Sequence, residues 1–392
     1  MTISLFSIGS FQDISIFDFL NFFIIFSFLF FSVLYFQLNL TISLILFLHL
    51  ITSLLFHPLF IGENIYPDVQ NYFEPAIQLR SGFEEYFPLS DDSNIYKSPK
   101  SFQTFLFSFF PMFIETYYSL ALINLCFFYF LFFYCYQYKI FTFTTTLLYL
   151  LLPSIFLYSS IAIKEMLVFF FVFISMHQLL FKHNYFLSLL FVSPLFILRM
   201  PNLFIYFVIF FIFIILTLYL KKYYTLTLLF IISSLSSYLF LSNNVSLVDY
   251  NLFNFLEIQK VKISLAIENE LTYDLSFNIT SFISDLAIGI VHFIIYPFFN
   301  NVSLNEYFSP KIYFIVENIF LKLIVAYLFI FNLKKYNKQD LCLDFFFFLS
   351  AMLYGYVNVN YFNMNRYAFC IVITYILLKS FLLKKKYRSD LK

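Results

Sequence analysis

The sequence predicts an all-α integral membrane protein with about eleven transmembrane helices. Hydrophobic residues make up 62% of the 392 residues, whereas charged residues make up only 11%. A soluble protein carries about a quarter charged residues, because its surface must face water. Apolar runs of about 20 residues, the length that crosses a bilayer as a helix, recur along the whole chain. We therefore expect residues 1–392 to form a single polytopic membrane domain.

The apolar runs place the expected spans in order along the chain. These are 17–36, 40–60, 118–138, 141–159, 165–181, 186–199, 203–220, 225–241, 313–333, 343–358 and 366–383. Two further apolar segments, 101–115 and 281–299, contain a proline and charged residues, so we expect interfacial or re-entrant segments there. They belong to two large loops, 61–117 and 242–312. The N-terminus lacks a basic region before its apolar run, which favours a retained first span over a cleaved signal.

Basic residues predict how the spans are oriented, because lysine and arginine accumulate on the cytoplasmic side of a membrane. With eleven spans, the lysine clusters all fall on one face: Lys139, Lys182, Lys221, Lys222, Lys334, Lys335, Lys338 and the stretch from Lys379 to Lys392. Both large loops are acidic and fall on the opposite face. We therefore expect a cytoplasmic C-terminus, two extracytoplasmic loops and an external N-terminus.

Several classes of function lack support in the sequence. The net charge is +1 and no basic tract outside the C-terminus is dense, so we expect no nucleic-acid partner. There is no Walker loop, dinucleotide glycine motif, HExxH or GxSxG. The four cysteines lack metal-ligand spacing and are expected to be packing residues. The five histidines are dispersed, and we expect neither a metal nor a cofactor.

Charged residues close to membrane depth are costly, so each is a hypothesis for a functional site. Asp68 and Tyr72 open the first large loop, where a helix beginning after Pro67 would place them on one face. Asp68 there either stabilises the helix N-terminus or acts as a general base. Both interpretations stay open.

Two further places combine basic residues with the predicted external ends of spans. Lys164 and Glu165 separate two long apolar runs, and Arg199 ends a span just before Pro201. Lysine and arginine at such positions either anchor in the headgroups or bind phosphate. Arg366 and Tyr367 precede the last span in an asparagine-rich stretch. The predicted catalytic residues are Asp68, Arg199 and Arg366, and the predicted substrate-binding residues are Tyr72, Lys164, Glu165 and Tyr367.

These stretches resemble, in order, bacterial polytopic glycosyltransferases of the GT-C type and the related O-antigen or capsular polysaccharide polymerases. The likeness rests on DVxxYFxxA in the first large loop, PSIFLYSSIAIKE, LRMP and MNRY before the last span. The stretch DLAIGIVHFIIYPFF also resembles a proline-containing segment of such proteins. Many GT-C enzymes carry two acidic residues in the first outer loop. Here only Asp68 stands in the matching position, with Asp91 and Asp92 as candidates for the second.

The resemblance implies an enzyme that uses polyprenyl-phosphate or polyprenyl-pyrophosphate sugars at the outer face of the bacterial cytoplasmic membrane. It also implies other polysaccharide-assembly proteins as partners. Asp68 would then act on the acceptor hydroxyl, while Lys164, Arg199 and Arg366 would stabilise the departing lipid phosphate.

Two other classes remain as alternatives. A lipid-linked oligosaccharide flippase, or another transporter, would place charges along a central cavity. We instead expect spans almost free of charge, with ionisable residues gathered at the external ends, and this distribution favours an enzyme. A sugar acyltransferase would need a catalytic histidine at the end of a span, where His57 is a weak candidate. Among enzymes, we rank a repeat-unit polymerase slightly ahead of a single-sugar transferase.

Overall fold

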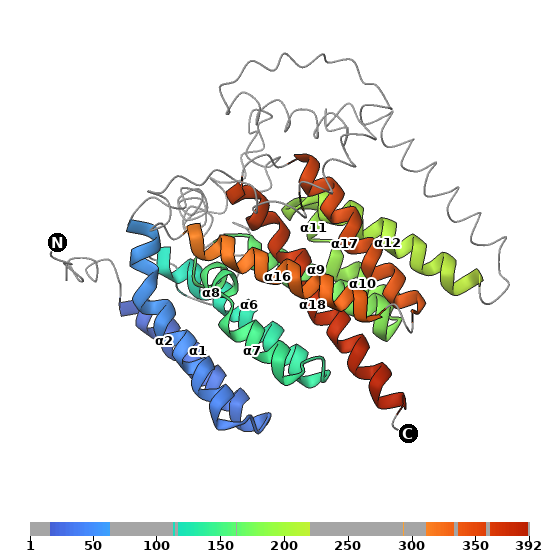
Figure 1. Ribbon diagram of the computed structural model, residues 1–392. Coiled ribbons are helices and arrows are strands. Elements are labelled where there is room, and N and C mark those ends of the chain that lie inside the picture. Colours follow the sequence, from blue (N-terminus) through green and yellow to red (C-terminus); the bar gives the residue numbers. More distant parts are fainter. Residues whose placement is uncertain are drawn as a thin grey trace, which may run out of the picture. The chain divides into compact units, whose positions relative to one another are not determined.

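A computed structural model describes residues 16–62, 113, 117–161, 163–219, 293, 311–332, 336–357 and 361–390 (Figure 1). Every regular element within these residues is a helix. The chain divides into two compact units, which are described separately below. Unit 1 comprises residues 1–173 and 193–200, and unit 2 comprises residues 174–192 and 201–392.

Unit 1 is organised around a central helix that is buried along most of its length. It contains α1 (Ile16–Tyr35), α2 (Leu40–Gly62), α6 (Tyr117–Gln137), α7 (Phe143–Leu151), α8 (Pro153–Ser160), the beginning of α9 (Glu165–His177) and α11 (Leu195–Leu198). The central helix is α6, which packs against α1, α2 and α8. Its apolar side chains therefore meet protein on several sides.

Polar contacts join the beginnings of α1 and α6 in unit 1. Ser119 Oγ donates a hydrogen bond of 2.5 Å to Asp18 Oδ1. Asn21 pairs with both backbone groups of Phe113, at 2.6 Å through its amide nitrogen and 3.0 Å through its oxygen. The two helices therefore begin at the same end of the unit, as the predicted orientation requires.

Two of the predicted spans are broken helices. Span 141–159 consists of α7 and α8, which meet at Leu152 with a bend of 51°. Pro153 explains the break, because proline lacks an N–H and suits the first turn of a new helix. Leu152 accordingly adopts the extended backbone that a residue before proline prefers. Span 186–199 is similarly divided into α10 (Tyr185–Val192) and α11 at Pro194.

Unit 2 is built from long helices. It contains the end of α9, the π-helix η4 (Gln178–Lys182), α10, α12 (Met200–Tyr219), α16 (Lys311–Asn332), α17 (Lys338–Val357) and α18 (Tyr361–Asp390). α18 packs against both α16 and α17. This packing brings the C-terminal helix alongside two others, and it positions the polar cluster described below.

Hydrogen bonds join helix ends at two places in unit 2. At the predicted cytoplasmic end, Gln339 Nε2 donates to the Leu180 carbonyl at 2.7 Å. At the predicted external end, Tyr354 donates to Asn202 Oδ1 at 2.5 Å, and Asn202 Nδ2 donates to Cys370 Sγ at 3.6 Å. Helix ends predicted to share a side therefore meet within this unit.

Three helices among the described residues are long and apolar enough to cross a membrane. They are Ile16–Tyr35, Tyr118–Gln137 and Glu165–Lys182, and the bent pair α7–α8 makes a fourth if it is counted as one span. Each predicted span except 225–241 overlaps a described helix. The other described helices do not meet the same test of length and apolarity, so the count of eleven stays a prediction.

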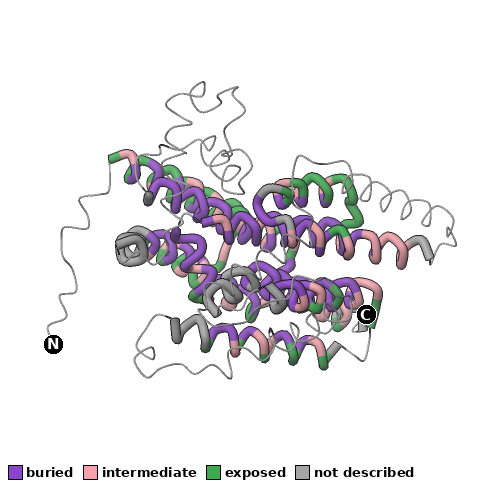
Figure 2. Tube along the Cα trace, turned by 90° about the horizontal axis from the view of Figure 1, so that it is seen from above, coloured by how far each residue is buried: buried purple, intermediate pink, exposed green. Residues whose placement is uncertain are grey.

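The surface of α1 supports the membrane class. It exposes large apolar side chains, namely Phe19, Leu20, Phe23, Ile24, Phe26, Phe30, Phe31 and Leu34. Figure 2 shows buried and exposed positions alternating along several helices. Soluble monomers rarely expose so large an apolar patch, whereas lipid accommodates it. The large loops 61–117 and 242–312 lie almost wholly outside the described residues.

Candidate functional site

Two of the predicted site residues, Glu165 and Arg199, form an ion pair in unit 1. Arg199 Nη2 donates a hydrogen bond of 3.0 Å to Glu165 Oε1. The exposed fraction of the side chain is 6% for Arg199 and 1% for Glu165. The two residues stand 34 positions apart, so folding brings together two motifs that the sequence analysis singled out separately.

Both residues of the pair stand at interruptions of helices. Glu165 is the first residue of α9, where the positive end of the helix dipole favours a carboxylate. The Lys164 carbonyl accepts the Val168 N–H at 2.9 Å, so Lys164 directly precedes the helix. Arg199 lies between α11 and α12 and has an extended backbone with φ −162° and ψ 84°. These interruptions let charged side chains leave the apolar surfaces of the helices.

The electrostatics of the pair follow from its burial. Removing a charge from water is expensive, and only a well-placed partner compensates for the loss. Glu165 and Arg199 compensate each other, and Lys164 adds a positive charge directly beside Glu165 in the chain. Lys164 is only partly buried. Lys164 and Arg199 are the two cationic side chains at this place, and such groups bind anionic ligands such as a phosphate.

Ile161, Ile163 and Lys164, which we call the connector, lie between the end of α8 and Glu165 at the start of α9. The Asn124 amide nitrogen in α6 donates to the Ile161 carbonyl at 2.6 Å and to the Ile163 carbonyl at 2.7 Å. Backbone carbonyls at membrane depth need such partners, since lipid supplies none. Asn124 is fully buried and was not among the predicted site residues. Its signal in the sequence is a lone amide within the interior of an apolar span.

A buried histidine and serine lie close to this connector. Ser159 Oγ is 2.9 Å from His49 Nε2 and donates to the Phe156 carbonyl at 3.0 Å. Because the carbonyl takes the hydroxyl proton, His49 Nε2 is the donor to Ser159. A nucleophilic serine needs the opposite arrangement, in which the histidine accepts its proton. The pair therefore ties α2 to α8. The His57 side chain lies outside the described residues.

The remaining predicted site residues are placed only in part. Asp68 and Tyr72 lie outside the described residues. Arg366 and Tyr367 lie in α18, and their side chains are outside the described part of the structure. Cys370 follows Arg366 by about one helical turn, at the end of α18 that contacts Asn202.

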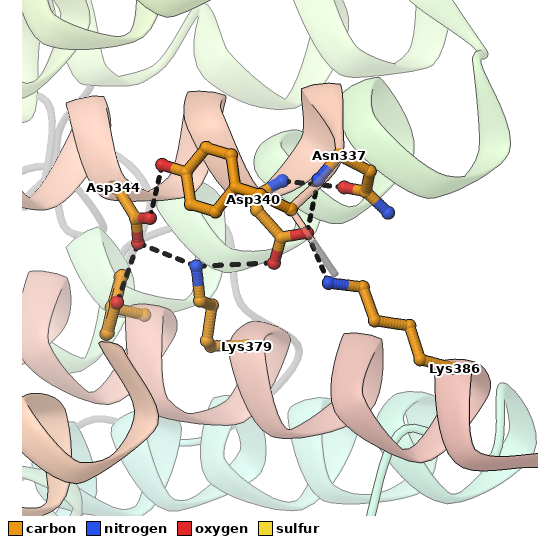
Figure 3. Close-up of polar contacts among 7 residues, drawn as sticks. Asn337, Asp340, Asp344, Lys379 and Lys386 are labelled. Carbon is orange, nitrogen blue, oxygen red and sulfur yellow. Dashed lines mark hydrogen bonds and ion pairs between the residues drawn. The ribbon is translucent and has the colours of Figure 1, made fainter. Parts of the chain in front are cut away.

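A second buried polar site, the α17–α18 cluster, was not predicted. Its members are Tyr336, Asn337, Asp340, Asp344, Tyr375, Lys379 and Lys386 (Figure 3). Lys379 Nζ lies 2.7 Å from Asp344 Oδ1 and 3.3 Å from Asp340 Oδ1, so it bridges both carboxylates. Lys386 Nζ lies 2.5 Å from Asp340 Oδ2. Two ammonium groups thus balance two carboxylates.

Hydrogen bonds complete the α17–α18 cluster. Asp344 accepts from the Tyr375 hydroxyl at 2.7 Å and from the Tyr336 hydroxyl at 2.6 Å. Burial, and then the hydrogen bond to Asp344, raises the pKa of Tyr336, which keeps this hydroxyl protonated as a donor. Asp340 also exchanges two hydrogen bonds with Asn337, which caps the beginning of α17.

The sequence contains a signal for this cluster. Asp340 and Asp344 are four residues apart, as are Tyr375 and Lys379, so each pair shares one face of its helix. Lys379 served in the sequence analysis only to orient the spans. A lysine within a predicted span needs a buried partner, but the sequence analysis did not apply this requirement to Lys379.

Unit 2 also contains charges inside a predicted span. α16 carries Glu317, which is 7% exposed, and Lys322, whose Nζ lies 5.3 Å from the ring centroid of Phe293. Both residues fall within the predicted span 313–333, so this span departs from the expectation of spans almost free of charge. Phe293 is buried against Phe347, with ring centroids 6.0 Å apart. It belongs to segment 281–299, which the sequence predicts to be interfacial or re-entrant.

The described residues thus define an all-helical protein whose apolar helices suit a membrane and which contains two buried ionic sites, the Glu165–Arg199 pair and the α17–α18 cluster. Comparison with known proteins adds no relative: no family model, no curated protein and no solved structure matches this chain. Among the described residues, no group of three or more histidine, cysteine, aspartate or glutamate side chains gathers into a metal site.

Proposed function

We propose that the protein is a membrane glycosyltransferase or a repeat-unit polymerase for O-antigen, capsule or exopolysaccharide. Its donor is a sugar linked to polyprenyl phosphate or pyrophosphate, used at the outer face of the bacterial cytoplasmic membrane. One observation carries the proposal. Arg199 is paired with Glu165 beside Lys164, where three helix ends interrupt an apolar environment. A buried guanidinium at such a place suits a lipid-linked phosphate.

The proposed reaction assigns a task to each predicted residue. The bond from the sugar carbon to the phosphate oxygen breaks, and a bond to the acceptor hydroxyl oxygen forms. Negative charge develops on the departing phosphate, where Arg199 and Lys164 stabilise it. Guanidinium donors point in different directions within one plane, so the group can bind a carboxylate and a phosphate together. Glu165 is therefore a positioning residue for Arg199.

The other assignments rest on the sequence. Asp68 takes the proton of the acceptor hydroxyl, and Arg366 adds a second guanidinium for the phosphate. Tyr72 and Tyr367 contact the substrate. The chemistry requires no cofactor, because the lipid phosphate is itself the leaving group. Other polysaccharide-assembly proteins would deliver the donor and remove the product.

A complementation experiment tests this function. Cells that lack the gene receive the wild type, Arg199→Ala, Asp68→Asn or Arg388→Gln, and their polysaccharide is separated on a gel. Arg388 lies at the predicted cytoplasmic end of α18 and serves as the control arginine. We expect long-chain material to disappear in the first two variants and to persist in the control. Unchanged banding in both Arg199→Ala and Asp68→Asn rejects the assigned roles.

A second candidate is a flippase for lipid-linked oligosaccharides, or another transporter. The observation that favours it is the pair of ionisable residues inside α16, Glu317 and Lys322, since transport pathways place such groups at membrane depth. The two functions leave different products when the gene is deleted. Loss of a polymerase leaves single repeat units at the cell surface, whereas loss of a flippase removes them from the surface.

A further inference from the structure

Asn124 contacts the connector and Ser160 directly precedes it, and each carries a polar atom without a hydrogen-bond partner among the described residues. These atoms are Asn124 Oδ1 and Ser160 Oγ. The two residues are 0% and 1% exposed, respectively. A buried polar atom without a partner costs free energy, so its presence in a folded protein calls for a reason.

The orientation of the Asn124 amide follows from its neighbours. Its nitrogen faces two carbonyl oxygens, of Ile161 and Ile163, and only a donor can stabilise that arrangement. The amide oxygen is therefore the atom that lacks a partner. This oxygen belongs to the same side-chain amide whose nitrogen holds the connector. The connector lies between Ser160 and Glu165.

The chemistry of these two atoms selects the ligand. An amide oxygen accepts and never donates, so it needs an O–H or an N–H. An ionised phosphate offers only acceptors and cannot satisfy it. A sugar offers hydroxyl groups that both donate and accept, and such a group satisfies an amide oxygen such as Asn124 Oδ1 as well as a hydroxyl such as Ser160 Oγ. The phosphate would instead meet the positive charges of Lys164 and Arg199.

We propose that the α8–α9 connector is a sugar-binding subsite, in which Asn124 Oδ1 and Ser160 Oγ bind hydroxyl groups of the glycan. This inference rests on the proposed function and names the part of the donor that the connector recognises. The subsite lies between the end of α8 and the start of α9, and an irregular backbone is tolerated there if it lines a site. Asn124 has two roles. Its amide nitrogen holds the connector backbone through the Ile161 and Ile163 carbonyls, and its amide oxygen accepts a hydrogen bond from a sugar hydroxyl.

The test compares Ser160→Ala with a matched control, Ser350→Ala. Ser350 is also fully buried, but its hydroxyl donates to the Phe346 carbonyl of its own helix at 2.6 Å. Full-length protein in detergent is titrated with decaprenyl phosphate and with decaprenyl-phosphate N-acetylglucosamine. Thermal unfolding of each variant is recorded in parallel. Removing a hydroxyl that has no partner among the described residues should leave the unfolding temperature of Ser160→Ala unchanged or raise it.

We expect the wild type and Ser350→Ala to bind the glycosylated lipid more tightly than the bare phosphate. Ser160→Ala should weaken binding of the glycosylated lipid by about five- to ten-fold, the effect of one hydrogen bond, and leave binding of decaprenyl phosphate unchanged. Equal affinity of the wild type for both lipids, or a preference that Ser160→Ala leaves intact, overturns the sugar-binding subsite. If the wild type binds neither lipid, the proposed function fails and this inference fails with it.

Discussion

Lys379 extends from α18 to place its Nζ 2.7 Å from Oδ1 of Asp344 in α17, and its side chain is wholly removed from solvent. The same ammonium group lies 3.3 Å from Asp340 Oδ1. Asp340 and Asp344 lie one turn apart on α17, so the lysine separates two carboxylates that would otherwise repel each other. This contact joins the last two helices of the chain.

We expect Lys379→Met to destabilise the protein strongly, because it leaves two buried carboxylates without their shared cation. Losing one partner of a buried ion pair costs roughly 3–5 kcal/mol in free energy of unfolding. The double variant Lys379→Met with Asp344→Asn should lose less than the sum of the single losses. Thermal unfolding in detergent measures the effect, with the exposed Lys182→Met as control. Strictly additive losses would mean that the two residues do not interact.

Variants of the Glu165–Arg199 pair should affect the stability of the protein and its activity to different extents. Glu165→Gln removes the counter-charge that Glu165 supplies to the buried Arg199 and should lower the free energy of unfolding by roughly 3 kcal/mol. Arg199→Lys keeps the positive charge but loses the planar fork. This variant should therefore stay closer to wild-type stability and still lose long-chain polysaccharide. Both variants are assayed for unfolding temperature and on polysaccharide gels, and wild-type polymer in Arg199→Lys would refute the need for a guanidinium.

Because His49 donates its hydrogen bond to Ser159, we expect the loss of this bond to lower the stability of the protein without affecting its activity. Ser159→Ala removes the acceptor for His49 Nε2 and should cost about 0.6–1.7 kcal/mol, as hydrogen bonds between membrane helices do. Polysaccharide production should continue at the wild-type level once the amounts of protein are matched. Loss of product in a stably folded Ser159→Ala protein would contradict this assignment and favour the acyltransferase alternative.

His183 predicts a dependence of stability on pH. Partial desolvation, and then the charges of Lys338 and Lys385, lowers the pKa of His183 below its ordinary value of 6.5. The unfolded chain therefore binds the proton more readily, so stability is present above pH 6.5 and declines as pH falls from 6.5 toward the lower folded pKa. His183 has a left-handed backbone with φ 53°, which asparagine tolerates.

The corresponding experiment compares unfolding temperatures at pH 7.5 and pH 5.5 in the wild type and in His183→Asn. The wild type should lose more stability at the lower pH than the variant does. An equal loss in both proteins would show that other groups cause the acid sensitivity.

The positions of the helices could be predicted to a large extent, because an apolar run is visible in local composition. The breaks at Leu152 and Pro194 are also foreseeable from proline chemistry, although the expected spans 141–159 and 186–199 were treated as continuous. The candidate site was predicted only in part. Glu165 and Arg199 were selected for their cost at membrane depth, but nothing in their spacing indicated that they would meet.

The sequence by itself determined that this chain suits a membrane, since hydrophobicity is a property of residues along the chain and needs no contacts to be recognised. Its lysines also predicted which helix ends share a side. Only the tertiary structure decided that Asn124 holds the connector, that Glu165 meets Arg199, and that Lys379 lies between Asp340 and Asp344. The physical reason is that a side chain's partner depends on how each helix is rotated about its axis and where it breaks. Packing against other helices sets both of these features.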